Sequence, residues 1–317
     1  MTKSSKYPSL PSLLILFLLL TFACKPINDS HLDKITPTLK NTLIPTKTPT
    51  PTPTPTPIPN ILHIEADGSG DFATLQEALE FVPEGGTIIL SSGTFMLEKP
   101  VDVNISIDIT GSGQEDSIID SSAAGYVFRF IGDQSVVLND LSIDHHGDKD
   151  ADIIMVEGGE ISILRCVIRH GNEAALRIRG NTVGRIQNSW FRNSMIGILI
   201  EDQAQPVIDS NQIMFNSSGI VYKDEASGEA INNRLAENHQ SSIEVNNHAV
   251  PMLRNNEIGS YLNNFDGQFG IRYQDFSGGM ASGNICLGQN MFEIFVADSA
   301  EPEFENNDCY IFPSTKK

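Results

Sequence analysis

The stretch "IDSNQIMFNSSGIVYKDE" (residues 208–225) has the pattern of two short strands joined by an Asn-rich turn. Apolar and polar residues alternate at a period of two, which is typical of half-buried strands. The apolar positions are Ile208, Ile213, Ile220 and Tyr222. Two short strands cannot bury each other in water, so the segment needs more chain of the same pattern to pack against.

The same pattern occurs twenty-two residues earlier, in "IQNSWFRNSMIGILIEDQ" (186–203). Its first apolar position recurs at spacings of 22 to 28 residues, as Leu138, Ile163, Ile186, Ile208, Ala230, Leu253, Ala281 and Phe304. A period near 22 predicts a β-solenoid, in which equivalent positions of successive coils stack about 4.8 Å apart. The coils then bury one another in series.

Two further columns support this register. The third residue after the repeated apolar position is Asn in five coils, at Asn211, Asn233, Asn256, Asn284 and Asn307. We expect these residues to form an inward ladder, because a buried amide must find hydrogen-bond partners. Cys286 and Cys309 also share a column, either as a stacked thiol pair or as a disulfide.

Before the coils, "ATLQEALEFVPEGG" (73–86) predicts a helix over 74–82. Thr74 and Glu77 form a capping box, and Leu75 and Ala78 lie on one apolar face. A solenoid exposes an apolar cross-section at its end, so we expect this helix to act as its lid.

The first 60 residues have a different character. Lys3 and Lys6 precede an apolar run from Leu13 to Phe22, which is typical of an export signal. Because Ala23-Cys24 follows, we expect a lipoprotein signal over 1–24 with lipid on Cys24. Residues 25–60 are rich in Thr and Pro and predict an extended linker. The protein is thus expected to be exported and lipid-anchored at the bacterial cell surface, with residues 61–317 as its β-helix domain.

The charge is strongly acidic. The chain holds 21 Lys and Arg and 40 Asp and Glu. Residues 1–60 contribute only six Lys and two Asp. Residues 61–317 therefore hold 15 basic and 38 acidic residues, a formal net charge of −23. Such a surface disfavours nucleic acid as a partner. We expect a monomer.

The stretch "ADGSGDFATLQEALEFVPEGGTIIL" (66–90), joined to coils with an Asn ladder, resembles the opening of pectinesterases and the pectin lyase-like superfamily. The resemblance covers about residues 61–312 and implies an all-β, single-stranded right-handed parallel β-helix. It does not extend to activity. Gln274-Asp275-Phe276 matches only part of one pectinesterase motif, and the paired Asp of polygalacturonases is missing beside "RHGN" (169–172).

One outward patch carries the candidate chemistry. Stacking of the coils predicts that Asp144, His145, Arg169 and His170 lie together, as groups for acid/base catalysis or ligand capture. Trp190 and Arg192 follow in the next coil as ligand-binding residues. An ordinary ladder of exposed polar side chains is the alternative interpretation.

The loop "HHGDKDAD" (145–152) places Asp148, Asp150 and Asp152 at alternate positions. Carboxylates in this pattern can hold Ca²⁺, although the downstream Glu of an EF-hand is absent. The alternative is a solvated acidic loop. No other cofactor is indicated.

Two functions follow from these patterns. The first is an anchored module that binds or scaffolds polysaccharide in the cell envelope. The second is a carbohydrate-active enzyme, such as a lyase, a hydrolase or a pectinesterase-like protein, that uses the outward patch. The missing motifs favour the first.

Overall fold

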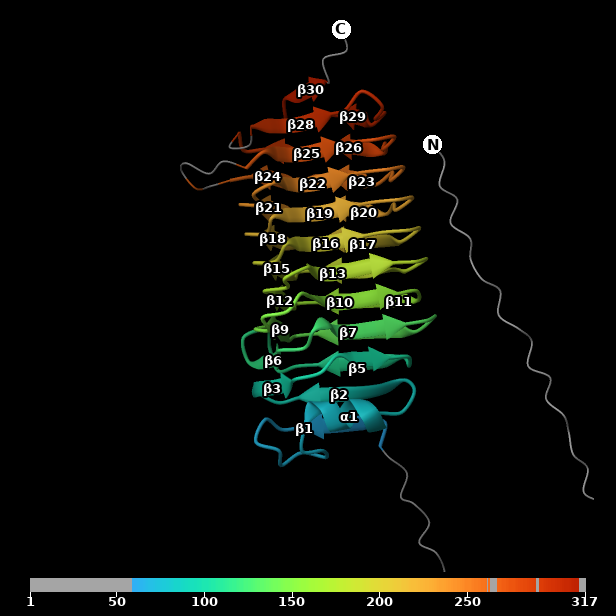
Figure 1. Cartoon of the computed structure of the whole chain (residues 1–317), viewed down its shortest axis with the longest axis vertical. Coiled ribbons are helices and arrows are strands. Elements are labelled where there is room, and N and C mark those ends of the chain that lie inside the picture. The colour runs from blue at the N-terminus through green and yellow to red at the C-terminus, as the bar shows by residue number, and fades with distance from the viewer. Residues whose placement is uncertain (1–58, 261, 263–266, 289–290, 314–317) are drawn as a thin grey trace, which may run out of the picture. The chain divides into compact units, whose positions relative to one another are not determined.

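The computed structural model describes residues 59–260, 262, 267–288 and 291–313. These residues belong to one compact unit, which forms a parallel β-solenoid (Figure 1). The predicted signal, the lipid site at Cys24 and the linker up to residue 58 lie outside the described residues and stay predictions. Within the described part, no helix is long and apolar enough to cross a bilayer.

Each complete coil contributes one strand to each of three parallel sheets. Sheet A is formed by β1 (Ile61–Ile64), β2 (Gly86–Leu90), β5 (Ile107–Thr110), β8 (Ser135–Asn139), β11 (Glu160–Leu164), β14 (Val183–Gln187), β17 (Gln205–Asp209), β20 (Glu229–Ile231), β23 (Met252–Arg254), β26 (Met280–Ser282) and β29 (Glu303–Glu305).

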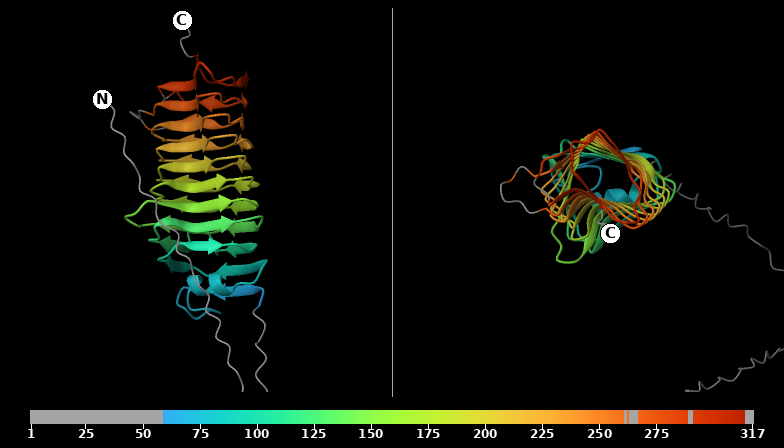
Figure 2. Two further views of the ribbon diagram at one scale, coloured as in Figure 1. Left: turned by 45° about the vertical axis from the view of Figure 1, so that its right-hand side comes forward. Right: turned by 90° about the horizontal axis from the view of Figure 1, so that it is seen from above.

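Sheet B is formed by β3 (Gly93–Leu97), β6 (Ser117–Ser121), β9 (Ser142–His145), β12 (Val167–Arg169), β15 (Trp190–Arg192), β18 (Gln212–Met214), β21 (Arg234–Ala236), β24 (Glu257–Gly259) and β27 (Ile285–Cys286). Sheet C is formed by β4 (Val101–Val103), β7 (Gly125–Ile131), β10 (Ala151–Glu157), β13 (Ala174–Arg179), β16 (Ile196–Ile200), β19 (Ser218–Tyr222), β22 (Ser241–Val245), β25 (Phe269–Tyr273), β28 (Phe292–Val296) and β30 (Ile311–Pro313). Seen along the axis, the coils superimpose around a common interior (Figure 2).

The predicted register is confirmed. In sheet A, Ile186 pairs with Ile208, and Ile208 pairs with Ala230. In sheet C, Ile198 pairs with Ile220. These side chains are fully buried and belong to one continuous hydrophobic core. The opening stretch is therefore stabilised by the coils directly above and below it.

The Asn ladder is also confirmed. The Asn233 amide nitrogen Nδ2 donates to the Ile208 carbonyl at 2.7 Å and to Asn256 Oδ1 at 3.0 Å. The Asn233 oxygen Oδ1 accepts from the backbone N–H of Asn211 at 2.9 Å. The same bonds continue through Asn284 to Asn307. The Asn233 amide therefore satisfies the turn of the preceding coil and also bonds the Asn of the following coil.

A second, shorter Asn ladder was not predicted. Asn216 Nδ2 donates to Asn238 Oδ1 at 3.1 Å, at the turn from sheet B to sheet C. Near the C-terminal end, Cys286 and Cys309 form a disulfide, which decides between the two alternatives left by the sequence.

The turn from sheet A to sheet B has a left-handed residue in eight successive coils. These residues have φ between 49° and 63° and are Asp140, Arg165, Asn188, Ser210, Asn232, Asn255, Gly283 and Asn306. Asn, Asp and Gly tolerate this conformation better than other residues, which explains their frequency here. The tight turn directs the next side chain into the ladder.

Helix α1 (Leu75–Phe81) begins where the sequence indicated. The Thr74 hydroxyl accepts a hydrogen bond from the Glu77 N–H at 3.1 Å, and Leu75 and Ala78 join the buried core. Its role as a lid remains a prediction.

Candidate functional site

Four charged residues stand side by side on the outer face of sheet B. Asp120 on β6 pairs in register with Asp144 on β9, which pairs with Arg169 on β12, and Arg169 pairs with Arg192 on β15. A neighbouring column contains Trp190. Parallel stacking thus brings residues from four coils onto one surface.

The loop between β5 and β6, residues 111–116, closes one side of this surface. The Gly111 N–H donates to the Asn139 carbonyl at 2.9 Å, and the Ser112 N–H donates to the Ser117 hydroxyl at 2.8 Å. The Ser142 hydroxyl donates to the Gln114 carbonyl. These bonds hold Gln114 and Glu115 beside the strands of sheet B.

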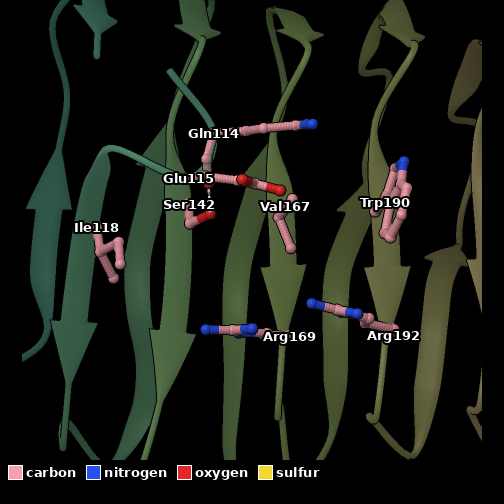
Figure 3. Close-up of a pocket in the computed structure, with 8 residues that line it drawn as sticks. All are labelled: Gln114, Glu115, Ile118, Ser142, Val167, Arg169, Trp190 and Arg192. Carbon is pink, nitrogen blue, oxygen red and sulfur yellow. Dashed lines mark hydrogen bonds between the residues drawn. The ribbon is translucent and has the colours of Figure 1, made fainter. Parts of the chain in front are cut away.

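Two adjoining hollows result. The first has a volume of about 310 Å³ (Figure 3). Its lining residues are Gln114, Glu115, Ile118, Ser142, Val167, Arg169, Trp190 and Arg192. The second, of about 390 Å³, shares Gln114, Glu115 and Trp190 with the first and extends to Arg165 and Asp140. We call the two hollows together the sheet B groove.

Trp190 and Arg192 form a pair in the groove. The Arg192 guanidinium carbon lies 5.4 Å from the centre of the Trp190 ring, within the range of a cation–π contact. Arg165 and Arg169 each pair with an Asp, whereas Arg192 has no carboxylate partner among the described residues. The Arg192 Nε also has no hydrogen-bond partner among them. Arg192 is therefore available to an anion.

Asp144 is the centre of a polar cluster next to the groove. Only 3% of Asp144 is exposed. Its Oδ2 accepts from Arg169 Nε at 2.7 Å, and its Oδ1 lies 2.6 Å from His170 Nδ1. Asn193 Nδ2 lies 3.2 Å from His170 Nε2. If Asn193 donates this bond, His170 carries its proton on Nδ1, facing Asp144.

His146 completes the cluster from the loop that follows β9. Its Nδ1 lies 2.7 Å from Asp120 Oδ1, and its Nε2 lies 3.9 Å from Asp144 Oδ1. The hydrogen bond with Asp120 raises the pKa of His146, and the nearby charge of Asp144 acts in the same direction. The rings of His146 and His170 lie 5.9 Å apart.

His145 is not where we expected it. Its side chain is buried, and its Nε2 lies 2.8 Å from the Ala123 carbonyl. Strand β12 ends at Arg169, and His170 leaves it with φ of 68° and turns outward. Strand β9 continues through His145, so alternation turns this side chain inward, in register with buried Ser121.

The predicted Ca²⁺ ligands do not come together. Asp148 and Asp150 are exposed, whereas Asp152 is buried. Asp152 accepts hydrogen bonds from Arg177 and from the Ala174 N–H. Among the described residues, the grouping that could hold a metal is instead Asp144, His146 and His170.

Sequence reasoning missed Asp120, Glu115 and the position of His146. Asp120 could have been found by extending the register one coil toward the N-terminus, because it lies 24 residues before Asp144. The approach of Gln114 and Glu115 depends on long-range contacts of a loop, which no repeat pattern reports.

Comparison with known proteins agrees with this architecture. A family model described as "Right handed beta helix region" matches residues 106–258. ORF18 of Geobacillus virus E2 superimposes with a TM-score of 0.57 at 13% identity, over 80% of this chain and 61% of that chain. This chain thus spans less than two thirds of the viral protein. Pectin methylesterase from carrot gives a TM-score of 0.51 at 16% identity, over 84% and 86% of the two chains. No curated protein matches the sequence.

These findings define the class of protein. The chain has the right-handed parallel β-helix fold, which it shares with carrot pectin methylesterase. Similarity at this level of identity concerns the fold alone, so function has to be argued from the groove.

Proposed function

We propose that this protein binds an acidic polysaccharide in the sheet B groove and holds it at the bacterial cell surface. The observation that carries the proposal is the pair of Trp190 and Arg192. It combines a flat aromatic ring with a cation that has no carboxylate partner among the described residues, and Trp190 lines both hollows.

The chemistry of the groove fits a uronate-type sugar. A sugar ring can stack on the Trp190 indole, and its carboxylate can accept charge-assisted hydrogen bonds from Arg192. Gln114 and Glu115 face the same hollow and can bind hydroxyl groups (Figure 3). The net charge of −23 for residues 61–317 repels polyanions, so binding depends on this local site.

The fold supports the same class of ligand. Pectin methylesterase, whose name specifies a polysaccharide, has the same fold. A polysaccharide that runs parallel to the solenoid axis would cross several strands of sheet B. The anchoring part of the proposal rests on Cys24 and the Thr/Pro-rich linker. Radioactive fatty acid should label the wild type in cells but not Cys24→Ser; equal labelling of both would overturn the anchor.

Binding is tested with polygalacturonate, alginate and neutral dextran in affinity electrophoresis. Trp190→Ala together with Arg192→Ala should weaken binding to an acidic polymer at least tenfold, or about 1.4 kcal/mol. The matched control is Gln212→Ala with Met214→Ala, the register partners one coil further on. If the groove variant and the control variant bind equally well, the proposed site is wrong.

Asp144 and His170 favour a second candidate, a carbohydrate-active enzyme. Their 2.6 Å contact beside Arg169 holds an imidazole in a fixed orientation next to a carboxylate, and a positioned imidazole can act as a general acid or base. Incubation with the same polymers should then release reducing ends or unsaturated products absorbing at about 235 nm, and His170→Ala should abolish the release. Product formation that is equal in both proteins would exclude this role of His170.

A further inference from the structure

The geometry points to a binding site for a divalent transition-metal ion, such as Zn²⁺, formed by Asp144, His146 and His170. We call these three residues the His–Asp triad. One ligand atom from each lies within 4.8 Å of the other two. This site is distinct from the predicted Ca²⁺ loop and uses none of its three aspartates.

The distances within the triad suit a small ion. Zn²⁺ binds imidazole nitrogen and carboxylate oxygen at about 2.0–2.2 Å, so tetrahedral ligands lie about 3.3 Å apart. The Asp144 Oδ1 lies 2.6 Å from His170 Nδ1 and 3.9 Å from His146 Nε2. One distance is shorter and the other longer than the separation of two tetrahedral zinc ligands. When a cation binds His170 Nδ1, the imidazole proton moves to Nε2, where the Asn193 amide can turn its Oδ1 to accept it. The side chains of Asp144 and His170 then need only small adjustments to hold the ion.

Asp120 independently prepares His146 as a ligand. Its Oδ1 lies 2.7 Å from His146 Nδ1, and a carboxylate can only accept there, so Nδ1 carries the proton. When His146 is neutral, its Nε2 then has a free lone pair on the side of Asp144. A metal-binding histidine commonly has such a carboxylate on its other nitrogen, which fixes the tautomer and the ring orientation.

The surroundings leave room for metal and substrate. The His146 side chain is 60% exposed, so the coordination positions not filled by the triad face solvent. Arg169 binds the other oxygen of Asp144 and lines the groove, so it connects the triad to the groove. Two imidazoles with one carboxylate favour Zn²⁺, Fe²⁺ or Co²⁺ over the hard ion Ca²⁺.

The test is titration of the metal-free full chain with Zn²⁺ by calorimetry, and with Co²⁺ by visible absorption. We expect one equivalent of Zn²⁺ to bind and Co²⁺ to give a d–d spectrum. His146→Ala and His170→Ala should each weaken Zn²⁺ binding at least tenfold. A tenfold excess of Ca²⁺ should not displace the ion.

Two further variants separate the triad from general effects. Asp120→Asn, which keeps all three ligands, should weaken Zn²⁺ binding by about tenfold or more, as is typical when a carboxylate that hydrogen-bonds a metal-binding histidine is replaced. His248→Ala removes an exposed histidine that stacks on Phe276, and it should bind Zn²⁺ like the wild type. Absence of Zn²⁺ binding, or equal binding by the wild type and both triad variants, would overturn the proposal. Because no polysaccharide is present, the result is independent of the proposed function.

Discussion

The coils from β6 to β15 and those from β18 to β24 share one register but differ on both sides of sheet B. Outside, the earlier coils present Asp144, Arg169 and Arg192, whereas the paired positions in the later coils are Met214, Ala236 and Gly259. Inside, the later coils have the continuous Asn ladder. The corresponding residues of the earlier coils are Leu141, Cys166 and Ser189.

This difference indicates how the fold separates stability from function. The later coils repeat with little variation and satisfy their turns through one continuous ladder. The earlier coils depart from the repeat, with the loop at 111–116 and the longer segment at 146–150. The candidate site lies beside these departures from the repeat, as expected when local rules are broken for function.

The largest effect should come from the ladder. Asn233→Leu removes the partners of the Ile208 carbonyl and of the Asn211 and Asn256 side chains, all of which are buried. We expect a loss of about 3 kcal/mol in the free energy of unfolding, because these groups stay unsatisfied. Denaturant unfolding measures it.

The control for this change is Gln212→Leu, on the outer face of β18, which should cost far less. Asn232 is a poor control, because its φ of 55° disfavours Leu and its Nδ2 donates to Asp209. Equal losses for Asn233→Leu and Gln212→Leu would contradict the ladder as the main source of stability in the later coils.

A smaller effect is expected in the earlier coils. Asp144→Asn should cost about 2 kcal/mol, since a buried acceptor of Arg169 and His170 loses its charge. Glu257→Gln in a later coil, whose contact with Arg234 is 3.9 Å and exposed, should change stability by about 0.5 kcal/mol or less. If the two substitutions lower the free energy of unfolding equally, the contacts of Asp144 with Arg169 and His170 add no more stability than an exposed ion pair.

Extending the ladder should give a small gain. Ser189 stands directly before Asn211 in the column, and its hydroxyl accepts from the Cys166 N–H at 3.1 Å. Ser189→Asn can keep this bond and add one to the carbonyl of the preceding coil, as Asn211 does. We expect about 1 kcal/mol of added stability in thermal or denaturant unfolding. A destabilised variant would show that the earlier coils cannot hold a ladder.

The smallest response is expected from Cys166. Burial raises the pKa of its thiol to about 12. Because the thiolate is the reactive form, a disulfide reagent at pH 8 should leave Cys166 unlabelled in the native protein and react with it after unfolding. Since the folded pKa is raised, the thiol contributes stability fully below the unfolded pKa and loses it as the pH rises toward 12. Rapid labelling of Cys166 in the native protein would mean that this coil opens readily.

Much of this structure could be predicted from sequence, for a simple reason. Inward positions such as Ile186 and Ile208 recur at a fixed period and touch their own equivalents, so the pattern contains the contacts. The direction of His145 depended instead on β9 being one residue longer than β12. The positions of Glu115 and Asp120 depended on a loop and on a coil outside the regular repeat. The sequence thus predicted that Asp144 lies beside Arg169 and His170, but it did not predict Asp120 and Glu115 near them.

The left-handed residue at each turn from sheet A to sheet B has a wider consequence. Since every coil from Asp140 to Asn306 contains its own turn residue, each bend depends only on its own coil and on the coil next to it. Gain or loss of a whole coil would therefore leave the remaining bends intact. The distance between the groove and either end of the solenoid can change in steps of about 4.8 Å, so the position of the groove along the solenoid can evolve independently of its chemistry.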